Sequence, residues 1–276
     1  MSQPVLSSIH IHPLKAVRGH APREAVVEPW GLAGDRRWVL VDAEDKIVTQ
    51  RQHPRLALAA AEQLPGGVRV SAPGREPLTV EVPEPAGPAA TTTIQVWKDK
   101  VEAVLCDPAA HAWWSAYLET DIRMLHLDDP ATRRPLDPAY ARPGETVSFA
   151  DGYPLLVTTL SSLDALNSLI AQGDHADEGP LPMNRFRPNV VVSGTAPWAE
   201  DDWSRIAIGE VAFRITKKCG RCVVTTTDQE TAERGKEPLR TLARHRRFGD
   251  QLCFGTNLVP EGRGRVRVGD PVTVLE

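Results

Sequence analysis

Two cysteines lie three positions apart among cations, in the segment KKCGRC at 217–222. Nearby Lys and Arg side chains favour the thiolate, the form of cysteine that attacks electrophiles and binds metals. Half of a zinc site is one alternative, but Cys106 and Cys253 stand alone and no H-x₃₋₅-H follows. A thioredoxin-like pair should open a helix, whereas 223–227 is predicted to be a strand. A structural turn with two idle thiols stays open as a further alternative.

A second group of polar side chains occupies NRFRPN at 184–189, just before the apolar run 190–192. In an extended segment alternate side chains share a face, so Arg185, Arg187 and Asn189 are predicted to project together. Two guanidiniums and a carboxamide suit a phosphate or another oxyanion, because Arg presents a planar fork of donors. The alternative is a solvated strand edge.

Hydroxyl side chains gather at 158–162, where an apolar strand is predicted to enter a helix. Thr159, Ser161 and Ser162, together with the free N–H groups of a first helical turn, form a candidate anion site. Ordinary capping explains Ser161 equally well, because Ser161 and Asp164 have capping-box spacing.

Two further cations, Lys15 and Arg36, lie near the N-terminus in the segments PLK and GDRRW. Either could be a surface charge when taken alone. Combined with the arginines of 184–189, they would supply several cations for one multiply charged anionic ligand. His10 and His12 alternate on one predicted strand face, and we do not expect them to bind a metal.

The first half of the chain, which must position Lys15 and Arg36, reads mainly as short strands. A hairpin is predicted between 36–42 and 47–52. Asp107 as N-cap and Pro108 at the first helical position begin a predicted helix. Further strands are expected at 24–28, 56–63, 67–72, 78–82, 93–97 and 101–105. Many short strands at this spacing favour a barrel or a sandwich.

The second half is separated from the first by a segment rich in Pro and charge at 128–146, predicted to be a linker or long loop. Strands are expected at 153–157, 189–193, 210–216, 223–227 and 266–268. Helices are expected from 160 to Gly173 and at 237–247. The predicted organisation is therefore a domain at 1–127, a linker at 128–150 and a domain at 151–276.

The composition is that of an ordinary globular protein, with 276 residues, 41% hydrophobic and 25% charged. A formal net charge of −4 gives no general attraction to nucleic acid or to anionic membranes. No apolar run is long enough to span a membrane, and the N-terminus lacks the pattern of a secretory signal. Four cysteines are too few for a disulfide framework. We therefore expect a cytoplasmic protein.

The sequence resembles the MOSC proteins that carry a MOSC N-terminal β-barrel domain, the family that contains the amidoxime-reducing components. The matching segments extend over nearly the whole chain: IHPLK, GLAGDRRW, VTQRQHPRL, LLVTTLSSLDALN, FRPNVVVSG, W-x₄-IGEV, CGRCVVTTTD, KEPLRTL and VRVGDPVTVL. The resemblance implies an α+β, β-rich fold, with an N-terminal β-barrel-like domain and a MOSC-type β-barrel domain flanked by helices.

The resemblance also implies a molybdenum cofactor, Mo-molybdopterin, whose phosphate needs cations. The family's metal-binding cysteine lies in an R-C-[VI]-[VL]-T-T segment, which assigns the metal and the catalytic role to Cys222, and Cys219 is not expected to be a ligand. The cofactor-binding residues implied by the family segments are Lys15, Arg36, Thr159, Ser161, Ser162, Arg185, Arg187, Asn189, Arg221 and Cys222. Thr159, Ser161 and Ser162 match less specifically than the others.

The activity implied is two-electron reduction of N-hydroxylated compounds, from N–OH to N–H with release of water. The chain has too few cysteines for an additional [2Fe–2S] cluster, so electrons are expected from separate proteins, a flavin reductase and a small iron–sulfur or haem carrier. Two other functions stay open: a sulfur carrier with a persulfide on Cys222, and a protein that stores the cofactor. The substrate loop is expected at 128–146 or 172–184.

Overall fold

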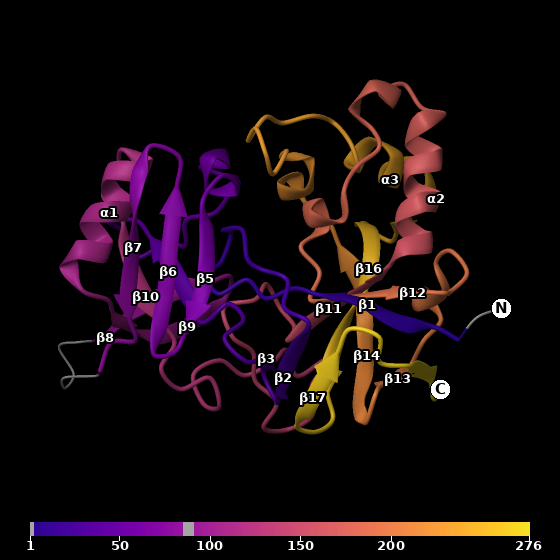
Figure 1. Cartoon of the computed structure of the whole chain (residues 1–276), viewed down its shortest axis with the longest axis horizontal. Coiled ribbons are helices and arrows are strands. Elements are labelled where there is room, and N and C mark those ends of the chain that lie inside the picture. Colours follow the sequence, from indigo (N-terminus) through magenta and orange to yellow (C-terminus); the bar gives the residue numbers. More distant parts are fainter. Residues whose placement is uncertain (1–2, 85–90) are drawn as a thin grey trace.

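The computed structural model describes residues 3–84 and 91–276 and shows a β-rich chain with three α-helices in that part. Figure 1 shows two lobes side by side. One lobe holds α1 and β4–β10, and the other holds most of the second half together with β1. Both the N-terminus and the C-terminus lie at the second lobe. The β-rich fold class predicted from the sequence is confirmed.

The second lobe is built on the largest sheet, whose strand order is β1-β12-β11-β16-β14-β13-β18. Its two edges approach each other, because Val5 bridges to Pro271 and the Val272 N–H donates to the Pro4 carbonyl at 2.8 Å. The sheet is therefore a nearly closed barrel around an apolar core. Its strands are β1 (Val5–Ile9), β11 (Leu155–Thr159), β12 (Val190–Ser193), β13 (Arg205–Ile208), β14 (Val211–Gly220), β16 (Gln251–Pro260) and β18 (Val272–Val274), with β15 (Arg247–Phe248) paired to β16.

The first lobe contains two smaller antiparallel sheets. Helix α1 (Pro108–Leu118) packs on them through Trp113, Trp114 and Tyr117, which are buried. The Asp107 side chain accepts a hydrogen bond from the Ala109 N–H, so the predicted cap is confirmed. The strands are β4 (Trp38–Val41), β10 (Arg123–His126), β9 (Asp99–Leu105) and β8 (Thr91–Val96) in one sheet, and β5 (Ala60–Leu64), β6 (Gly67–Ala72) and β7 (Arg75–Glu81) in the other.

The first strands of the chain do not stay within the first lobe. β1 pairs with β12, and β2 (Glu24–Glu28) pairs with β17 (Gly264–Arg267) as well as with β3 (Gly31–Leu32). The chain therefore leaves the second lobe after β3 and returns to it after a loop that follows β10. The boundaries 1–127 and 151–276 remain a prediction about domains, but the sheets join strands from both ranges.

Helices α2 (Leu160–Ala171) and α3 (Leu239–His245) lie together at one end of the second lobe, where Figure 1 shows them above the barrel. They share an apolar cluster with Phe186 and Phe254. The N-cap of α2 is Thr159, whose hydroxyl accepts a bond from the Ser162 N–H. The alternative in which Ser161 caps this helix is wrong, because the N-cap lies two residues before Ser161.

Two predicted extended segments are short 3₁₀ turns instead. The segment after Cys222 is a turn at Val223–Thr226, because the Thr225 and Thr226 hydroxyls donate back to the carbonyls of Cys222 and Val223, both at 2.9 Å. Met183–Phe186 is a similar turn, and Arg187 follows with a left-handed φ of 51°. The predicted common face of alternate residues from 185 to 189 is therefore absent.

The hairpin predicted between 36–42 and 47–52 is present only next to its turn. An antiparallel bridge joins Val41 to Ile47, and the Val48 N–H donates to the Leu40 carbonyl at 2.9 Å, but the second strand does not continue. The Thr49 carbonyl accepts bonds from the Gln52 and His53 N–H groups, which makes a turn in place of a second strand. The other strands predicted in the first half are present, except that the one predicted at 56–63 begins only at Ala60, after a 3₁₀ turn at Pro54–Ala57. The long loop predicted at 128–146 is confirmed. None of the helices in the described residues is long and apolar enough to cross a membrane.

Candidate functional site

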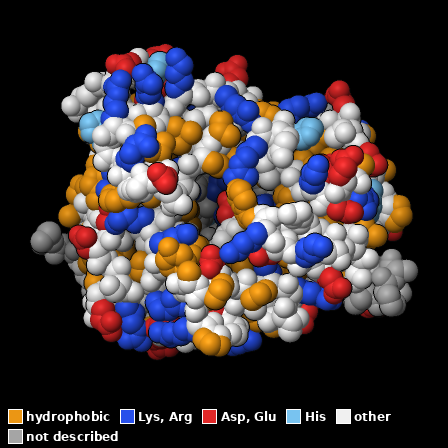
Figure 2. Space-filling view, turned by 180° about the vertical axis from the view of Figure 1, so that it is seen from behind, with side chains coloured by type: hydrophobic (Ala, Val, Ile, Leu, Met, Phe, Trp, Pro, Cys, Tyr) orange, Lys and Arg blue, Asp and Glu red, His pale blue; other side chains and the backbone are white. Residues whose placement is uncertain are grey.

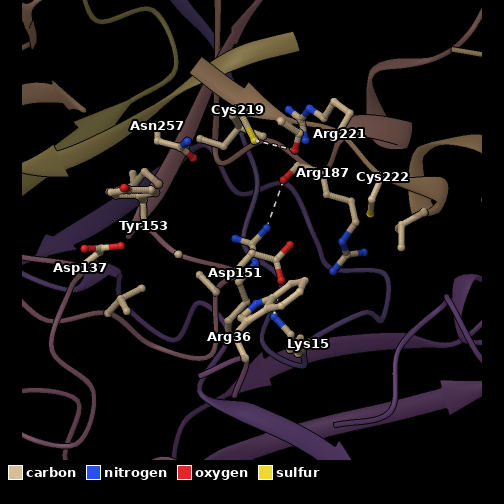
Figure 3. A pocket seen from close by; sticks show the side chains of 18 of the residues that line it. Lys15, Arg36, Asp137, Asp151, Tyr153, Arg187, Cys219, Arg221, Cys222 and Asn257 are labelled. Carbon is tan, nitrogen blue, oxygen red and sulfur yellow. Dashed lines mark hydrogen bonds and ion pairs between the residues drawn. The ribbon is translucent and has the colours of Figure 1, made fainter. Parts of the chain in front are cut away.

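A central cavity of about 1070 Å³ lies between the two lobes and collects most of the residues that the sequence singled out. Its walls come from both halves of the chain, and Trp97 belongs to its lining. Figure 3 shows Lys15 and Arg36 on one side and Arg187 and Cys222 on the other. Figure 2 shows a hollow between the lobes with Lys and Arg side chains around it. Among the described residues, nine Lys or Arg and three Asp line the cavity, so it favours an anionic ligand.

Cys222 reaches this cavity because strand β14 ends at Gly220 and the backbone then turns. Cys222 is the residue before the 3₁₀ turn at Val223–Thr226, and its carbonyl accepts bonds from the N–H and the hydroxyl of Thr225. These bonds fix the direction of the side chain. The thiol is half-buried and belongs to the cavity wall, as a metal ligand requires.

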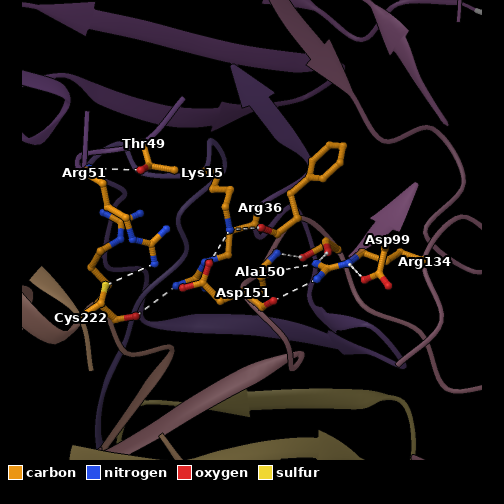
Figure 4. Close-up of polar contacts among 12 residues, drawn as sticks. Lys15, Arg36, Thr49, Arg51, Asp99, Arg134, Ala150, Asp151 and Cys222 are labelled. Atoms are coloured by element: carbon orange, nitrogen blue, oxygen red, sulfur yellow. Dashed lines mark hydrogen bonds and ion pairs between the residues drawn. The ribbon is translucent and has the colours of Figure 1, made fainter. Parts of the chain in front are cut away.

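Arg51 is the neighbour of the Cys222 sulfur, and the sequence prediction missed it. The Arg51 Nη2 atom donates to the Cys222 Sγ at 3.3 Å (Figure 4). The turn at Thr49–Gln52 holds Arg51 there, since the Arg51 N–H donates to the Thr49 hydroxyl at 3.1 Å. Arg51 lies in the segment VTQRQHPRL, but its position in a turn of the first lobe could not be inferred from a predicted strand.

Lys15 lines the cavity floor as a buried cation with two partners (Figure 4). Its Nζ donates to the Phe149 carbonyl and to the Asp151 carboxylate, both at 2.7 Å. Burial lowers the pKa of Lys15, while Asp151 opposes that shift. In return, Lys15 holds the pKa of Asp151 well below its usual range. Asp151 was not predicted, because only the fold brings it to Lys15.

Arg36, Asn189 and Arg187 form one hydrogen-bonded group. Arg36 Nη1 donates to the Asn189 Oδ1 at 3.0 Å, and Arg36 Nη2 donates to the Arg187 carbonyl at 3.1 Å. Asn189 is 1% exposed, and its Oδ1 also accepts from the Leu156 N–H while its Nδ2 donates to the His10 carbonyl. Asn189 thus holds Arg36 in place, with its Oδ1 accepting two bonds and its Nδ2 donating one.

The Arg187 guanidinium is the strongest sign of a missing anion. Its Nη2 atom is buried and has no hydrogen-bond partner in the described part of the chain. Burial, and then the neighbouring Arg36, lower the pKa of Arg187 to about 9. Asp35 and Asp151 oppose that shift, but a buried donor without a partner is costly unless a ligand compensates it. The donors present therefore fit the phosphate of a cofactor.

Arg185 and Arg221 also line the cavity, but the protein itself uses most of their donors, and in the described part of the chain Arg185 Nε has no partner. Arg185 donates to the Thr226 carbonyl and to the Asp228 carboxylate, at 3.1 and 2.8 Å. Arg221 donates to the carbonyls of Phe254 and Phe186. Both side chains brace the segment around Cys222, which gives them a supporting position rather than an open binding position.

The three hydroxyl side chains predicted to form an anion site lie outside the cavity lining. Thr159 and Ser162 donate to the buried carboxylate of Glu200, at 3.2 and 2.8 Å. Ser161 contacts Thr195 and the Ala196 carbonyl. Burial raises the pKa of Glu200, and the two hydroxyls oppose that shift. The structure therefore brings Lys15, Arg36, Arg187, Asn189 and Cys222 together, and it places these three hydroxyls elsewhere.

Cys219 lines the cavity without sharing the contacts of Cys222. Its sulfur lies 3.8 Å from the Gly220 carbonyl, and burial raises the pKa of its thiol. The described residues contain no group of three or more His, Cys, Asp or Glu that could hold a metal ion. Of the two cavity thiols, Cys222 is the one that contacts a cation, and one thiolate ligand suits a metal that brings its other ligands with it.

The long loop at 128–146 contributes Arg134–Pro138 to the cavity wall, whereas 172–184 contributes nothing. Arg134 is 3% exposed and is not a solvated cation. It donates to the Ser148 and Ala150 carbonyls at 3.0 and 2.5 Å and to the Asp151 carbonyl at 2.9 Å (Figure 4). Arg134 thus fixes the segment that presents Asp151 to Lys15.

Two family models match the chain. Residues 3–121 match the model described as the MOSC N-terminal beta barrel domain, and residues 144–273 match the model described as the MOSC domain. Together they cover both lobes and nearly all of the cavity lining.

Similar proteins match the chain over nearly its full length. It is 31% identical over 286 residues to the mitochondrial amidoxime-reducing component 1 of Homo sapiens, covering 98% of this chain and 82% of that protein. It is 30% identical over 288 residues to the mitochondrial amidoxime reducing component 2 of Rattus norvegicus, covering 97% and 82%. It is also 29% identical over 269 residues to the molybdenum cofactor sulfurase of Danio rerio, covering 92% of this chain and 31% of that protein.

Proposed function

Because the chain belongs to the family that joins a MOSC N-terminal beta barrel domain to a MOSC domain, we propose that it is a molybdenum-cofactor-dependent reductase of N-hydroxylated compounds. The observation that carries the proposal is the cavity in which the half-buried thiol of Cys222 lies beside Arg51 and among an excess of cations. Relatives named for amidoxime reduction support the substrate class.

In this proposal Cys222 supplies the protein's thiolate ligand to molybdenum, and Lys15, Arg36 and Arg187 bind the anionic part of the cofactor. The unpaired Nη2 of Arg187 supports this assignment, since a phosphate would give it a charge-assisted partner. When bound, the cofactor would supply the two-electron reduction of N–OH to N–H with release of water.

The remaining residues of the cavity orient and hold these groups. Arg51 donates to the Cys222 sulfur and so holds one orientation of the side chain. Arg185 and Arg221 brace the backbone around Cys222 through the carbonyls that they contact. Asn189 fixes Arg36, and Asp151 offsets the charge of Lys15. Such fixed donors need no rearrangement when an anion binds.

Reduction of benzamidoxime to benzamidine tests the proposed function. The purified chain, loaded with cofactor by its expression host, is supplied with reduced methyl viologen and the product is quantified. We expect turnover that depends on Cys222, with the Cys222→Ala variant inactive. Absence of benzamidine from a preparation that contains about one molybdenum per chain would reject the reductase and favour a storage protein.

We further propose that the electrons reach the cavity from separate proteins, a flavin reductase and a small iron–sulfur or haem carrier, in the cytoplasm. With NADH alone, the chain should not reduce benzamidoxime, because the sequence has no G-x-G-x-x-G that opens a helix after a strand. Adding a flavin reductase and a carrier should restore turnover with NADH. Turnover with NADH alone, by protein free of flavin, would contradict this part of the proposal.

A second candidate is a sulfur carrier that holds a persulfide on Cys222, favoured by the similarity to a molybdenum cofactor sulfurase. The half-buried sulfur and its contact with Arg51 suit a persulfide as well as a thiolate. Analysis of the purified chain separates the two candidates. Labile sulfur without molybdenum supports the carrier, whereas molybdenum without labile sulfur supports the reductase.

A further inference from the structure

Trp97 occupies a backbone conformation that its side chain disfavours. It is the first residue of the two-residue turn between β8 and β9, in a hairpin where Val96 pairs with Asp99. Its φ is 57°, in the left-handed region. This position of a two-residue hairpin turn favours Gly, Asn or Asp, and a bulky residue there is strained. Trp97 is also 56% exposed, so burial of the ring does not explain its presence.

The surrounding contacts hold this turn at the rim of the cavity. Asp99 accepts from Arg134 Nε at 3.2 Å, and Lys98 lies 3.5 Å from the Asp137 carboxylate. Both partners belong to the loop that lines the cavity. The Gln95 side chain donates to the Trp97 carbonyl at 3.0 Å. The hairpin is therefore fixed to the loop, and Trp97 stays part of the cavity lining.

Arg51 connects Trp97 to the candidate metal ligand. The Arg51 guanidinium lies 4.9 Å from the centre of the Trp97 ring and donates to the Cys222 sulfur at 3.3 Å. A guanidinium stacked on an indole covers one face of the ring. Trp97 is more than half exposed and lines the cavity, so its ring keeps surface that a flat molecule in the cavity can contact.

We propose that Trp97 is the stacking platform of the substrate, so that the site prefers aromatic N-hydroxylated compounds to aliphatic ones. The inference rests on the proposed function and names the substrate class of the same site. A ring stacked on the face of Trp97 that Arg51 leaves free is separated from the Cys222 sulfur by the Trp97 ring and the Arg51 guanidinium. The N–OH group attached to that ring must therefore pass the edge of the indole to approach the sulfur.

The test compares benzamidoxime with acetamidoxime, which carries the same N–OH group without the ring. Oxidised protein without an electron donor cannot turn over either compound, so calorimetry gives both Kd values. Trp97→Ala should weaken benzamidoxime binding about threefold to tenfold, the value of one aromatic pair. Acetamidoxime binding should change less than about twofold. Trp97→Phe keeps a ring and should restore most of the benzamidoxime affinity.

Trp30 provides the matched control. It also lies in a turn between two strands and stacks with an arginine, since Arg263 lies 5.5 Å from its ring, but it does not line the cavity. Trp30→Ala should leave both Kd values unchanged. Benzamidoxime should also quench part of the tryptophan fluorescence of the wild type. That quenching should disappear in Trp97→Phe although the binding remains.

The outcomes separate this inference from the proposed function. If Trp97→Ala weakens the binding of benzamidoxime and acetamidoxime equally, or changes neither Kd, the proposal that Trp97 stacks on the substrate is overturned. This holds whatever turnover is measured. A selective loss of benzamidoxime binding supports the platform even if no variant produces benzamidine, a result that would reject the reductase. Failure of the wild type to bind benzamidoxime would overturn the platform as well.

Discussion

At the scale of single residues, the account depends most on Arg187, whose buried Nη2 has no partner in the described chain. Arg187→Ala should weaken retention of the cofactor by about 1.5–3 kcal/mol, the value of a charge-assisted contact. Arg187→Lys should restore only part of it, because a point charge cannot copy a planar fork. The measurement is the molybdenum that remains per chain after dialysis of each variant.

Arg265→Ala is the control for the loss of one positive charge, since Arg265 is an exposed residue on β17 outside the cavity lining. It should retain the molybdenum of the wild type. If Arg187→Ala retains as much molybdenum as this control, Arg187 does not bind the cofactor.

The sequence predicted those site residues that lie inside motifs, and it missed those that only the fold brings together. Lys15, Arg36 and Arg187 line the cavity as predicted from clustered cations. Arg51 and Asp151 were missed, because their partners are more than a hundred residues away along the chain. Hydroxyl side chains near a helix start can cap the helix as readily as they can bind an anion. At 159–162 the structure shows capping, by Thr159.

At the scale of elements, the start of α2 shows how one hydroxyl serves two purposes. Thr159 accepts from the Ser162 N–H at 3.1 Å and donates to the buried Glu200 carboxylate at 3.2 Å. Thr159→Ala removes a cap and a bond to a buried acid, so the free energy of unfolding should fall by about 1–3 kcal/mol. Ser161→Ala should cost less than about 0.5 kcal/mol, as Ser161 is not the cap. Urea unfolding compares the two, and a larger loss for Ser161→Ala would contradict this assignment.

Strand β10 contains a buried histidine, His126, whose protonation should destabilise the folded chain at low pH. His126 is 5% exposed and packs against Trp38 of β4, with ring centres 4.4 Å apart and the rings tilted by 48°. Burial, followed by Arg37, lowers the pKa of His126 to about 4. Between pH 6.5 and about 4 the unfolded chain binds a proton that the folded chain does not. The free energy of unfolding should therefore fall as the pH falls through that window, by about 3 kcal/mol at most.

Replacing His126 with Phe keeps a ring beside Trp38 and removes the titration. Denaturant unfolding at a series of pH values should then show a shallower loss between pH 6.5 and 4 than the wild type. His245→Gln, at an exposed position, serves as the control and should keep the wild-type profile. Identical profiles for the wild type and His126→Phe would show that His126 does not contribute.

The sequence predicted the type of an element correctly where the apolar pattern was regular. The prediction failed where side chains form hydrogen bonds to the backbone. The run VVTTT has strand composition, but the threonine hydroxyls close a turn after Cys222. Strand β16 was not predicted, although it is central to the barrel. Its sequence QLCFGTNLVP lacks alternation, and Gly255 has a φ of 73°. A strand buried through most of its length needs no polar face.

At the scale of the whole molecule, the cavity lies at the junction of the two lobes, and residues of both form its walls. Lys15 and Arg36 come from the first half of the chain, and Arg187 and Cys222 come from the second. A cofactor bound by both sides stabilises only the folded arrangement. The loaded chain should therefore have a Tm about 5–10 °C above that of chain from a host that cannot make the cofactor. Equal Tm values, with molybdenum present in one sample only, would contradict binding of the cofactor between the lobes.

The most direct test of the central claim is the molybdenum content per chain of three proteins made in one cofactor-producing host. Wild type and Cys219→Ala should each contain about one molybdenum, because the Cys219 sulfur does not contact Arg51 and is not assigned as a ligand. Cys222→Ala should contain far less, since it lacks the thiolate proposed to bind the metal. A full molybdenum content in Cys222→Ala, or an equal loss in Cys219→Ala, would contradict the assignment of Cys222 as the single protein ligand.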